Sequence, residues 1–109
     1  MNLSIRYEKM EDGHFVYLSG EIDAYTAPQL RESLLPLAEQ VDEDVTVDLS
    51  DVQYIDSTGL GIFIGVFKAM HAHKGRLMLV GMSERVERLF TITGLDEVIT
   101  IEKKGEGLA

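Results

Sequence analysis

A serine that follows an aspartate and precedes two glycines is the part of this chain best suited to chemistry. The segment DSTGLG, from Asp56 to Gly61, stands between an alternating apolar run and a long uncharged one. Its Ser57 has the residue type that caps the first turn of a helix, because a serine hydroxyl accepts a hydrogen bond from a backbone N–H group without a helical partner. Capping is therefore one interpretation of Ser57. Covalent catalysis, nucleotide binding and phosphorylation are the others.

The surroundings of Ser57 argue against an enzyme that uses this serine as its nucleophile. A nucleophile elbow has the pattern G-x-S-x-G, and Ile55 stands where the first glycine would be. His71 and His73 lie about four turns further along the same predicted helix, roughly 20 Å away. His14 has no acid placed by the sequence to orient it. With no base in reach, we expect the protein not to be an enzyme.

Nucleotide or metal binding is also weakly supported. A phosphate-binding loop usually brings a lysine or a longer glycine pattern, which this segment lacks, and Asp56 would repel a phosphate. His71 and His73 are two residues apart on a helix and so face different sides, and the chain has no cysteine. We expect no metal and no cofactor. A nucleotide-binding module stays open as an alternative, which calorimetry with nucleotide alone would test.

Phosphorylation is a further interpretation of Ser57, beside capping, with which the position is compatible. A phosphoserine at a helix start meets free N–H groups and the positive end of the helix dipole, so the fold should tolerate it. The phosphate adds about −1.5 to −2 charges beside Asp56 and near Asp23. The surface then changes while the core survives, which suits a switch that acts on a partner. Thr58 offers a second, less favoured hydroxyl.

A strand and a helix are predicted to position this serine. Val45, Val47 and Leu49 alternate with polar residues, the period of a strand that buries one face. A turn over residues 51–56 follows, and a helix begins at Ser57. Its inward stripe is predicted to consist of Leu60, Phe63, Ile64, Phe67 and His71.

The other side of this helix carries no charge. It is predicted to consist of Gly61, Ile62, Gly65, Val66 and Ala69. Each glycine costs about 1 kcal/mol relative to alanine inside a helix. The helix is therefore either covered on both sides within the fold or offers a low-relief surface to another molecule. It is too short for a membrane span, which needs about 20 apolar residues.

The segments before the central strand predict a hairpin and a helix. Two alternating runs flank Asp12-Gly13, a sequence typical of a hairpin between antiparallel strands. Thr26 with Gln29 has the form of a capping box. The helix after it is predicted to bury Leu30, Leu34, Leu37, Ala38 and Val41. Pro36 predicts a kink or a break over residues 32–36, because a proline removes a helical hydrogen bond.

The segments after the central helix continue the alternation. Lys74-Gly75 is predicted to end that helix through a left-handed glycine. The apolar run 77–80 predicts a strand covered on both faces, and Ser83 predicts the cap of a further helix that ends at Gly94. Residues 98–101 predict a last strand, and residues 102–109 a solvated, flexible tail.

This order of segments predicts a single α/β domain. Alternating strands and helices favour parallel strand pairs, with the first strand added antiparallel, in a mixed sheet of about four to five strands with helices packed against it. Sites in such sheets gather at the C-terminal ends of strands. The turn after the second strand, with Asp23, and the turn with Asp56 and Ser57 should therefore share one edge.

Composition limits the partners. Ten lysines and arginines against nineteen aspartates and glutamates give a net charge of −9, which would repel a phosphate backbone and argues against direct nucleic-acid binding. Protein partners with basic surfaces are favoured. The N-terminus lacks an apolar signal core and no segment approaches spanning length, so we expect a cytoplasmic protein without membrane contact.

Several motifs together resemble a known family. Gly20-Glu21-Ile22-Asp23, Thr26-Ala27-Pro28 and, above all, the segment from Asp56 to Gly61 resemble the STAS-domain anti-sigma factor antagonists, with most similarity to the general-stress RsbV type. The similarity extends to the turn Ile92-Thr93-Gly94-Leu95, so that residues 1–101 would form the STAS domain. The resemblance implies the STAS fold and an anti-anti-sigma factor that works by partner switching in bacterial transcription.

The resemblance also implies partners and site residues. The unphosphorylated form would bind an anti-sigma factor and so release the sigma factor. That anti-sigma factor would be a serine kinase that uses ATP and magnesium, and a manganese- or magnesium-dependent PP2C-type phosphatase would reverse its action. Carried over, phosphorylation falls on Ser57, and the contact residues would be Asp23, Asp56, Ser57, Thr58, Gly59, Gly61, Ile62 and Gly65. An accessory or scaffold subunit of a sensory assembly stays open as an alternative.

Overall fold

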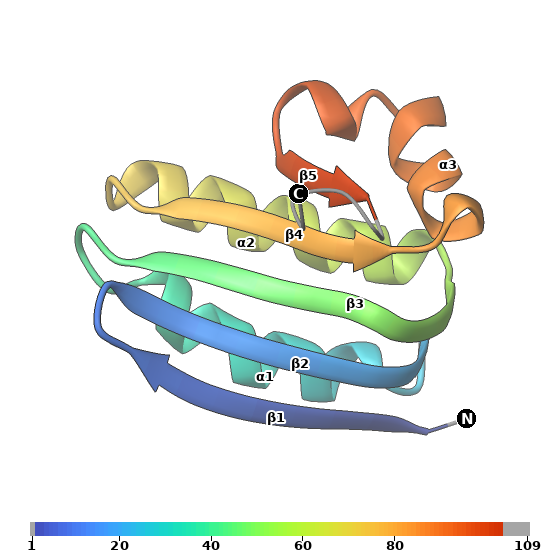
Figure 1. Ribbon diagram of the computed structural model, residues 1–109, viewed down its shortest axis with the longest axis horizontal. Coiled ribbons are helices and arrows are strands. Elements are labelled where there is room, and N and C mark those ends of the chain that lie inside the picture. The colour runs from blue at the N-terminus through green and yellow to red at the C-terminus, as the bar shows by residue number, and fades with distance from the viewer. Residues whose placement is uncertain (1, 104–109) are drawn as a thin grey trace.

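One mixed sheet of five strands organises the fold, and the computed structural model describes residues 2–103 of the chain (Figure 1). The elements are, in chain order, β1 (Leu3–Met10), β2 (Gly13–Ile22), α1 (Ala27–Ala38), β3 (Asp44–Ile55), α2 (Ser57–Ala72), β4 (Arg76–Met82), α3 (Glu84–Ile92), a short 3-10 turn η1 (Leu95–Glu97) and β5 (Thr100–Lys103). The strands lie in the order β1-β2-β3-β4-β5, with β1 antiparallel to β2 and each later pair parallel. This confirms the predicted hairpin and the predicted parallel pairs.

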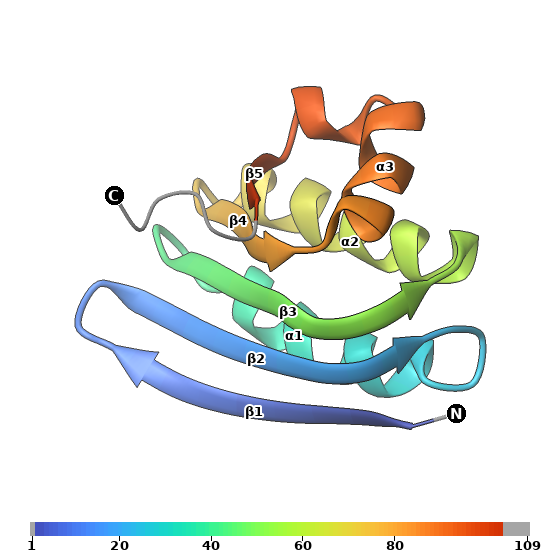
Figure 2. The same cartoon turned by 45° about the vertical axis from the view of Figure 1, so that its right-hand side comes forward.

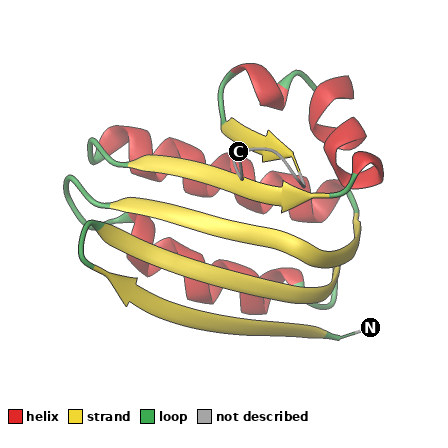
Figure 3. Cartoon of the chain, in the orientation of Figure 1, coloured by secondary structure: helices red, strands yellow, loops and turns green. Residues whose placement is uncertain are grey.

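Both long helices lie on the same face of the sheet, so the sheet has one covered and one open face (Figure 2, Figure 3). On β3, Val45 and Val47 are buried beneath the helices, whereas Thr46 and Asp48 are half-exposed on the open face. The same alternation runs through β4, where Met78 is half-exposed. The prediction that residues 77–80 are covered on both faces is therefore wrong, because within residues 2–103 no helix packs on the open side.

Strand β3 is longer than its sequence pattern suggests. Residues 51–56 were expected to form a turn, but the strand continues to Ile55 and only Asp56 separates it from α2. The end of β3 pairs with the end of β2, and the register between the two strands shifts twice on the way. Each shift breaks the period-two alternation that marks a strand, so this stretch looks like a loop in the sequence.

Helix α1 runs without a break through Pro36. Of the two outcomes expected over residues 32–36, a kink or a break, the break is therefore wrong. The expected capping box is also wrong, since Thr26 makes no side-chain cap bond and Gln29 donates instead to the backbone oxygen of Leu3, 3.0 Å away. Val41 lies beyond the helix and is exposed, so it does not extend the buried stripe.

The buried side of α2 differs from the predicted stripe. It is formed by Gly59, Leu60, Phe63, Val66 and Met70. Val66 was expected on the outer side, whereas His71, expected inside, is exposed. A helix that packs on a twisted sheet and on α1 buries a strip set by those neighbours, and an all-apolar sequence does not reveal which strip that is.

The end of α2 also differs from expectation. The left-handed residue is Lys74, with φ at 65°, and not Gly75. Gly75 is needed for a close approach, since a Cβ atom there would lie 2.3 Å from the carbonyl oxygen of Glu43.

The C-terminal part agrees with expectation in its helix but not in its last strand. Ser83 caps α3, where its hydroxyl oxygen accepts a hydrogen bond from the N–H of Val86 at 3.3 Å, and Gly94 follows with φ at 77°. Strand β5 starts at Thr100 and includes residues 102 and 103, which had been assigned to a tail. The rest of the predicted tail, 104–109, lies outside the described residues. Within the described part, no helix is long and apolar enough to cross a membrane.

A polar cluster closes the end of the sheet where β2 and β3 begin. His14 is buried, and its Nδ1 lies 2.6 Å from the hydroxyl of Tyr7. Its Nε2 lies 3.1 Å from Oε1 of Gln40 and 3.2 Å from Oε1 of Glu43, which also pairs with Lys9 at 3.1 Å. The hydrogen bond from Lys9, together with the charges of Lys9 and His14, holds the pKa of Glu43 below its ordinary value of 4.5.

Candidate functional site

The predicted site lies at the edge where β2 and β3 end. Ile22 and Ile55 are the last paired residues of these strands, and the N–H of Asp56 donates to the carbonyl oxygen of Ile22 at 3.1 Å. The loop that contains Asp23 and the turn that contains Asp56 and Ser57 are therefore neighbours. This confirms that the two turns share one edge of the molecule (Figure 1).

Asp56, and not Ser57, caps α2. Asp56 has extended backbone geometry, and its Oδ1 accepts a hydrogen bond from the N–H of Gly59 at 3.1 Å. Ser57 is instead the first residue of the helix. The expectation that Ser57 provides the cap is therefore wrong. Aspartate and serine are similarly good caps. Asp56 is the cap because it is the last residue with extended backbone geometry before the helix.

The hydroxyl of Ser57 is left free by this arrangement. Ser57 and Thr58 are both exposed, and the structure records no hydrogen bond to either side chain within residues 2–103. Their backbone N–H groups belong to the first turn of a helix, which has no internal acceptor for them. A group added to Ser57 would meet solvent, unpaired N–H donors and the positive end of the helix dipole.

Gly59 allows the first turn of α2 to pack closely against the ends of β2 and β3. It is buried, and a Cβ atom built on it would lie 2.5 Å from Cγ2 of Ile22 and 2.8 Å from Cγ1 of Ile55. Those distances are too short for any side chain, so the first turn of α2 can seat on the strand ends only with glycine here.

The Asp23 side chain is buried and forms hydrogen bonds within its own loop. Its side chain is only 8% exposed, and Oδ1 accepts hydrogen bonds from the N–H groups of Tyr25 and Thr26 at 2.9 and 3.0 Å. The hydroxyl of Thr26 donates to the carbonyl oxygen of Glu21 and accepts from the N–H of Asp23. Tyr25, which belongs to the same loop, is 87% exposed.

The outer side of α2 is flat and uncharged near its start. Gly61 and Gly65 are exposed, and a Cβ atom built on either would meet nothing within 4 Å. Ile62 is half-buried and packs against the core. We call Gly61, Ile62 and Gly65 the outer face of α2. It begins one turn after Ser57.

Three residues beside Ser57 were missed by the sequence reasoning. Tyr54, Arg85 and Arg88 line a cavity of about 460 Å³ together with Asp56 and Ser57. The arginines come from α3, whose position relative to Ser57 depends on tertiary packing. The one available signal was their spacing of three residues, which places them on the same side of a predicted helix.

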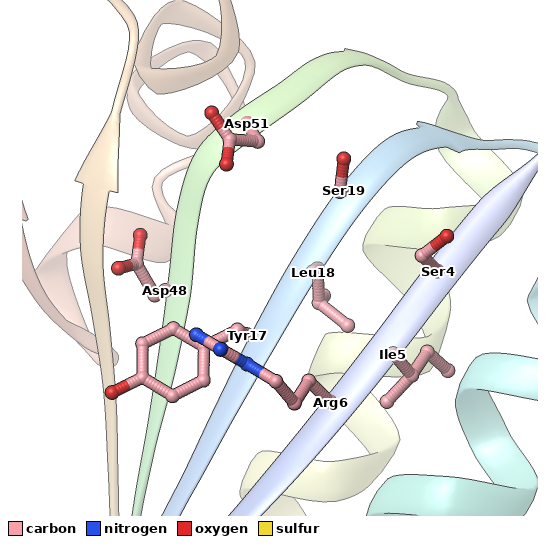
Figure 4. Close-up of a pocket in the computed structure, with 8 residues that line it drawn as sticks. All are labelled: Ser4, Ile5, Arg6, Tyr17, Leu18, Ser19, Asp48 and Asp51. Atoms are coloured by element: carbon pink, nitrogen blue, oxygen red, sulfur yellow. The ribbon is translucent and has the colours of Figure 1, made fainter.

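A second hollow lies on the open face of the sheet and shares no lining residue with the cavity beside Ser57 (Figure 4). Its volume is about 270 Å³, and Asp48 and Asp51 line it together with Arg6, which stacks over the ring of Tyr17 at 4.2 Å. The two carboxylates disfavour a nucleotide phosphate. Within residues 2–103 no cluster of three metal-binding side chains occurs.

Comparison with known proteins identifies the family. Residues 5–106 match the STAS domain model. The anti-sigma-B factor antagonist of Bacillus subtilis (strain 168) is 50% identical over 107 residues, which cover 98% of this chain and 97% of that protein. The crystal structure of an anti-sigma factor antagonist from Mycobacterium paratuberculosis superposes with a TM-score of 0.83, at 26% identity, over 93% of this chain and 86% of that one.

A third comparison concerns the fold alone. The structure of the Bacillus cell fate determinant SpoIIAA in the phosphorylated form superposes with a TM-score of 0.69 at 19% identity, over 90% of each chain. The mixed five-stranded sheet with its three helices is thus the STAS fold. Taken with the near full-length relatives, these findings show that the chain belongs to the STAS-domain family and, within it, to the anti-sigma-B factor antagonists.

Proposed function

We propose that this chain binds an anti-sigma-B factor through the start and the outer face of α2, and that phosphorylation of Ser57 ends the binding. As a member of the anti-sigma-B factor antagonists it is a regulator and not an enzyme. Binding would release the sigma factor for transcription. A protein that controls a sigma factor works where transcription takes place, so we place it in the cytoplasm.

The observation that carries the proposal is an exposed, unbonded hydroxyl beside an exposed helix face without charge. Inside a helix a glycine costs about 1 kcal/mol relative to alanine. Gly61 and Gly65 carry this cost although the fold leaves room for a side chain at both positions. Close approach of another molecule to the helix backbone would explain why they are glycines.

Charge explains how one modification could act as a switch. A phosphate adds about −1.5 to −2 charges at a turn that already contains Asp56 and is adjacent to Asp23. It would replace an uncharged contact by a strongly hydrated anion at the margin of the outer face. Asp56 would serve as an acidic contact beside Ser57, with Thr58 in the same contact loop, and Asp23 would contribute through the 8% of it that is exposed.

The proposed partners are therefore two proteins. The anti-sigma-B factor would be both the binding partner and the serine kinase, with ATP and magnesium. A PP2C-type phosphatase would remove the phosphate. The modification is proposed for Ser57 rather than Thr58, because Ser57 lies first in the helix and lines the cavity with Asp56.

The test uses the purified chain and the anti-sigma-B factor of the same organism. Incubation with ATP and magnesium should add one phosphate by intact mass, mapped to Ser57 by peptide analysis, and the complex should dissociate in size-exclusion chromatography. The Ser57→Ala protein should stay bound under the same conditions, and Thr58→Ala, the matched control, should behave like the wild type. Loss of the Ser57→Ala complex in the presence of ATP would refute the proposal.

Two other measurements test the alternative functions. A scaffold subunit of a sensory assembly would copurify in fixed stoichiometry whatever its phosphorylation state. A nucleotide-binding module would give saturable heats with ATP alone in calorimetry.

A further inference from the structure

We propose that the cavity between α3 and the start of α2 receives the phosphate carried by Ser57, with Arg85 and Arg88 as its ligands. This rests on the proposed phosphorylation of Ser57 and concerns what happens to the phosphate within the same molecule. The modified side chain would not simply point into water. It would be held by a second element of the fold.

The cavity has the position and size that such a role needs. Its volume is about 460 Å³, and Ser57, Arg85 and Arg88 are all among the residues that line it. Figure 1 shows α3 beside the turn that leads from β3 into α2, and Figure 2 shows the same neighbourhood from a different angle. A phosphate on the Ser57 hydroxyl would therefore lie at a cavity that both arginines line.

Helix α3 is a firm support for the two arginines. Val86 and Phe90 are buried on its inner side, and the ring of Phe90 lies 6.1 Å from the ring of Phe63 in α2. The same contact fixes α3 against the helix that carries Ser57. The guanidinium groups are thus presented by a packed element rather than by a mobile loop.

Both arginines are without a recorded partner in the part of the chain that the structure describes. Within residues 2–103 the structure records no ion pair or hydrogen bond for either guanidinium group. In a chain with nineteen acidic and ten basic side chains, two arginines without a recorded partner among residues 2–103 line the same cavity as Ser57. The pair is therefore available to an incoming anion.

The chemistry of the pair fits a phosphate. A guanidinium group donates two parallel hydrogen bonds to phosphate oxygens, and such charge-assisted bonds are about twice as strong as neutral ones. The unpaired N–H groups of Ser57 and Thr58 supply further donors at the helix start. The groups that oppose binding are the carboxylate of Asp56, which lines the cavity, that of Asp23 in the neighbouring loop, and those of Glu84 and Glu87, which lie beside the arginines along α3.

The test measures the second pKa of phosphoserine 57 by phosphorus NMR. Phosphoserine is installed at position 57 by genetic encoding, so no kinase is required. Ligation by two arginines should keep this pKa below its usual value of about 6. In the phosphorylated R85Q/R88Q protein the pKa should rise by about half a unit or more, because the carboxylates remain and the cations are gone.

Two further variants control the experiment. Arg76→Gln removes one cation at the opposite end of the sheet, where β4 begins, and should leave the phosphate pKa within about 0.1 unit of the wild type, given the screening of distant charges. R85K/R88K keeps both charges and should give an intermediate value. Circular dichroism confirms that each variant is folded, which is expected since both arginines are exposed.

Equal pKa values in the wild type and in R85Q/R88Q would overturn the inference, and so would an equal shift in Arg76→Gln. Neither result depends on whether the anti-sigma-B factor phosphorylates the chain. A phosphorylated wild type that still binds its partner would count against the proposed function and leave the pKa comparison to decide this inference separately.

Discussion

Asp56 and Ser57 are neighbours at the start of α2, and their side chains do different work. The Asp56 carboxylate accepts the capping hydrogen bond from Gly59, whereas the Ser57 hydroxyl is exposed and makes no recorded bond within residues 2–103. The sequence pattern could not assign the cap, because either residue type is suitable. The residue that caps α2 is the one at which extended backbone geometry ends, and its position depends on how far β3 pairs with β2.

Replacing each residue by alanine should separate the two roles. Asp56→Ala removes a cap and should lower the free energy of unfolding by about 1 kcal/mol. Ser57→Ala removes no contact and should change it by less than about 0.5 kcal/mol. Urea unfolding followed by circular dichroism measures both. Equal losses would mean that the Ser57 hydroxyl also supports the helix.

Glu43 predicts a dependence of stability on pH at the other end of the sheet. Its pKa in the folded protein is lowered by Lys9 and His14, so the ionised group stabilises the fold above the unfolded pKa. That stabilisation is lost as the pH falls through the lower, folded pKa.

Melting temperatures of the wild type and Glu43→Gln measure this effect. The wild type should melt higher at pH 7, and the difference should shrink as the pH is lowered below about 4.5, the ordinary value. Glu11→Gln, in the hairpin turn, removes the same charge away from His14 and should show a smaller dependence. A Glu43→Gln difference that grew toward low pH would contradict the sign of the pKa shift.

Helix α2 carries its glycines for two different reasons. Gly59 is packed against the ends of β2 and β3, whereas Gly61 and Gly65 face open space. The sequence showed three glycines in an uncharged helix and could not distinguish them. The distinction depends on which side of α2 contacts the sheet. The sequence did not show this, and the predicted buried stripe of α2 wrongly placed Val66 outside and His71 inside.

Alanine at the two exposed glycines should therefore stabilise the fold, whereas alanine at Gly59 should destabilise it. Gly61→Ala and Gly65→Ala should each raise the free energy of unfolding by up to about 1 kcal/mol. If the outer face is the docking surface, the same changes should weaken binding of the anti-sigma-B factor, on the order of tenfold or about 1.4 kcal/mol. Chemical unfolding and titration calorimetry give the two quantities.

Gly59→Ala is the matched control for these variants. It should destabilise the protein, because its Cβ atom would collide with Ile22 and Ile55. Unchanged partner binding by the stabilised Gly61→Ala and Gly65→Ala proteins would exclude the outer face from the interface.

Elements with local signals were predicted well from the sequence. The Asp12-Gly13 hairpin and the Ser83 cap each depend on a few adjacent residues, and both were correct. The second half of β3 was missed because its pattern is broken by register shifts with β2. At the site, Ser57 and Asp56 were found from their motif. Tyr54, Arg85 and Arg88 were missed, and the position of the two arginines relative to Ser57 depends on the packing of α3, which no local pattern shows.

Across the whole molecule, the proposed phosphorylation site and the core are separate. The buried side chains lie between the sheet and the helices, whereas Ser57, Thr58 and the outer face of α2 lie at the surface. An added negative charge at residue 57 should therefore change what the surface binds and leave the fold intact. The favourable interaction of an anion with a helix N-terminus supports the same expectation.

The Ser57→Asp variant tests this separation. Its melting temperature should stay within about 3 °C of the wild type, while its affinity for the anti-sigma-B factor should fall. Differential scanning calorimetry and a pull-down with the partner provide the two readings. Ser57→Asn adds a side chain of similar size without charge and should retain more binding than Ser57→Asp. A Ser57→Asp protein that is unfolded at room temperature would contradict the accommodation of charge at this helix start.

The cap provided by Asp56 has a consequence for speed. Because the neighbouring carboxylate holds the first turn of α2, esterification of the Ser57 hydroxyl would break none of the hydrogen bonds recorded there. Interconversion of the two forms would need no local melting and no refolding delay. The response time of such a circuit would then be set by the turnover of the enzymes that write and erase the mark.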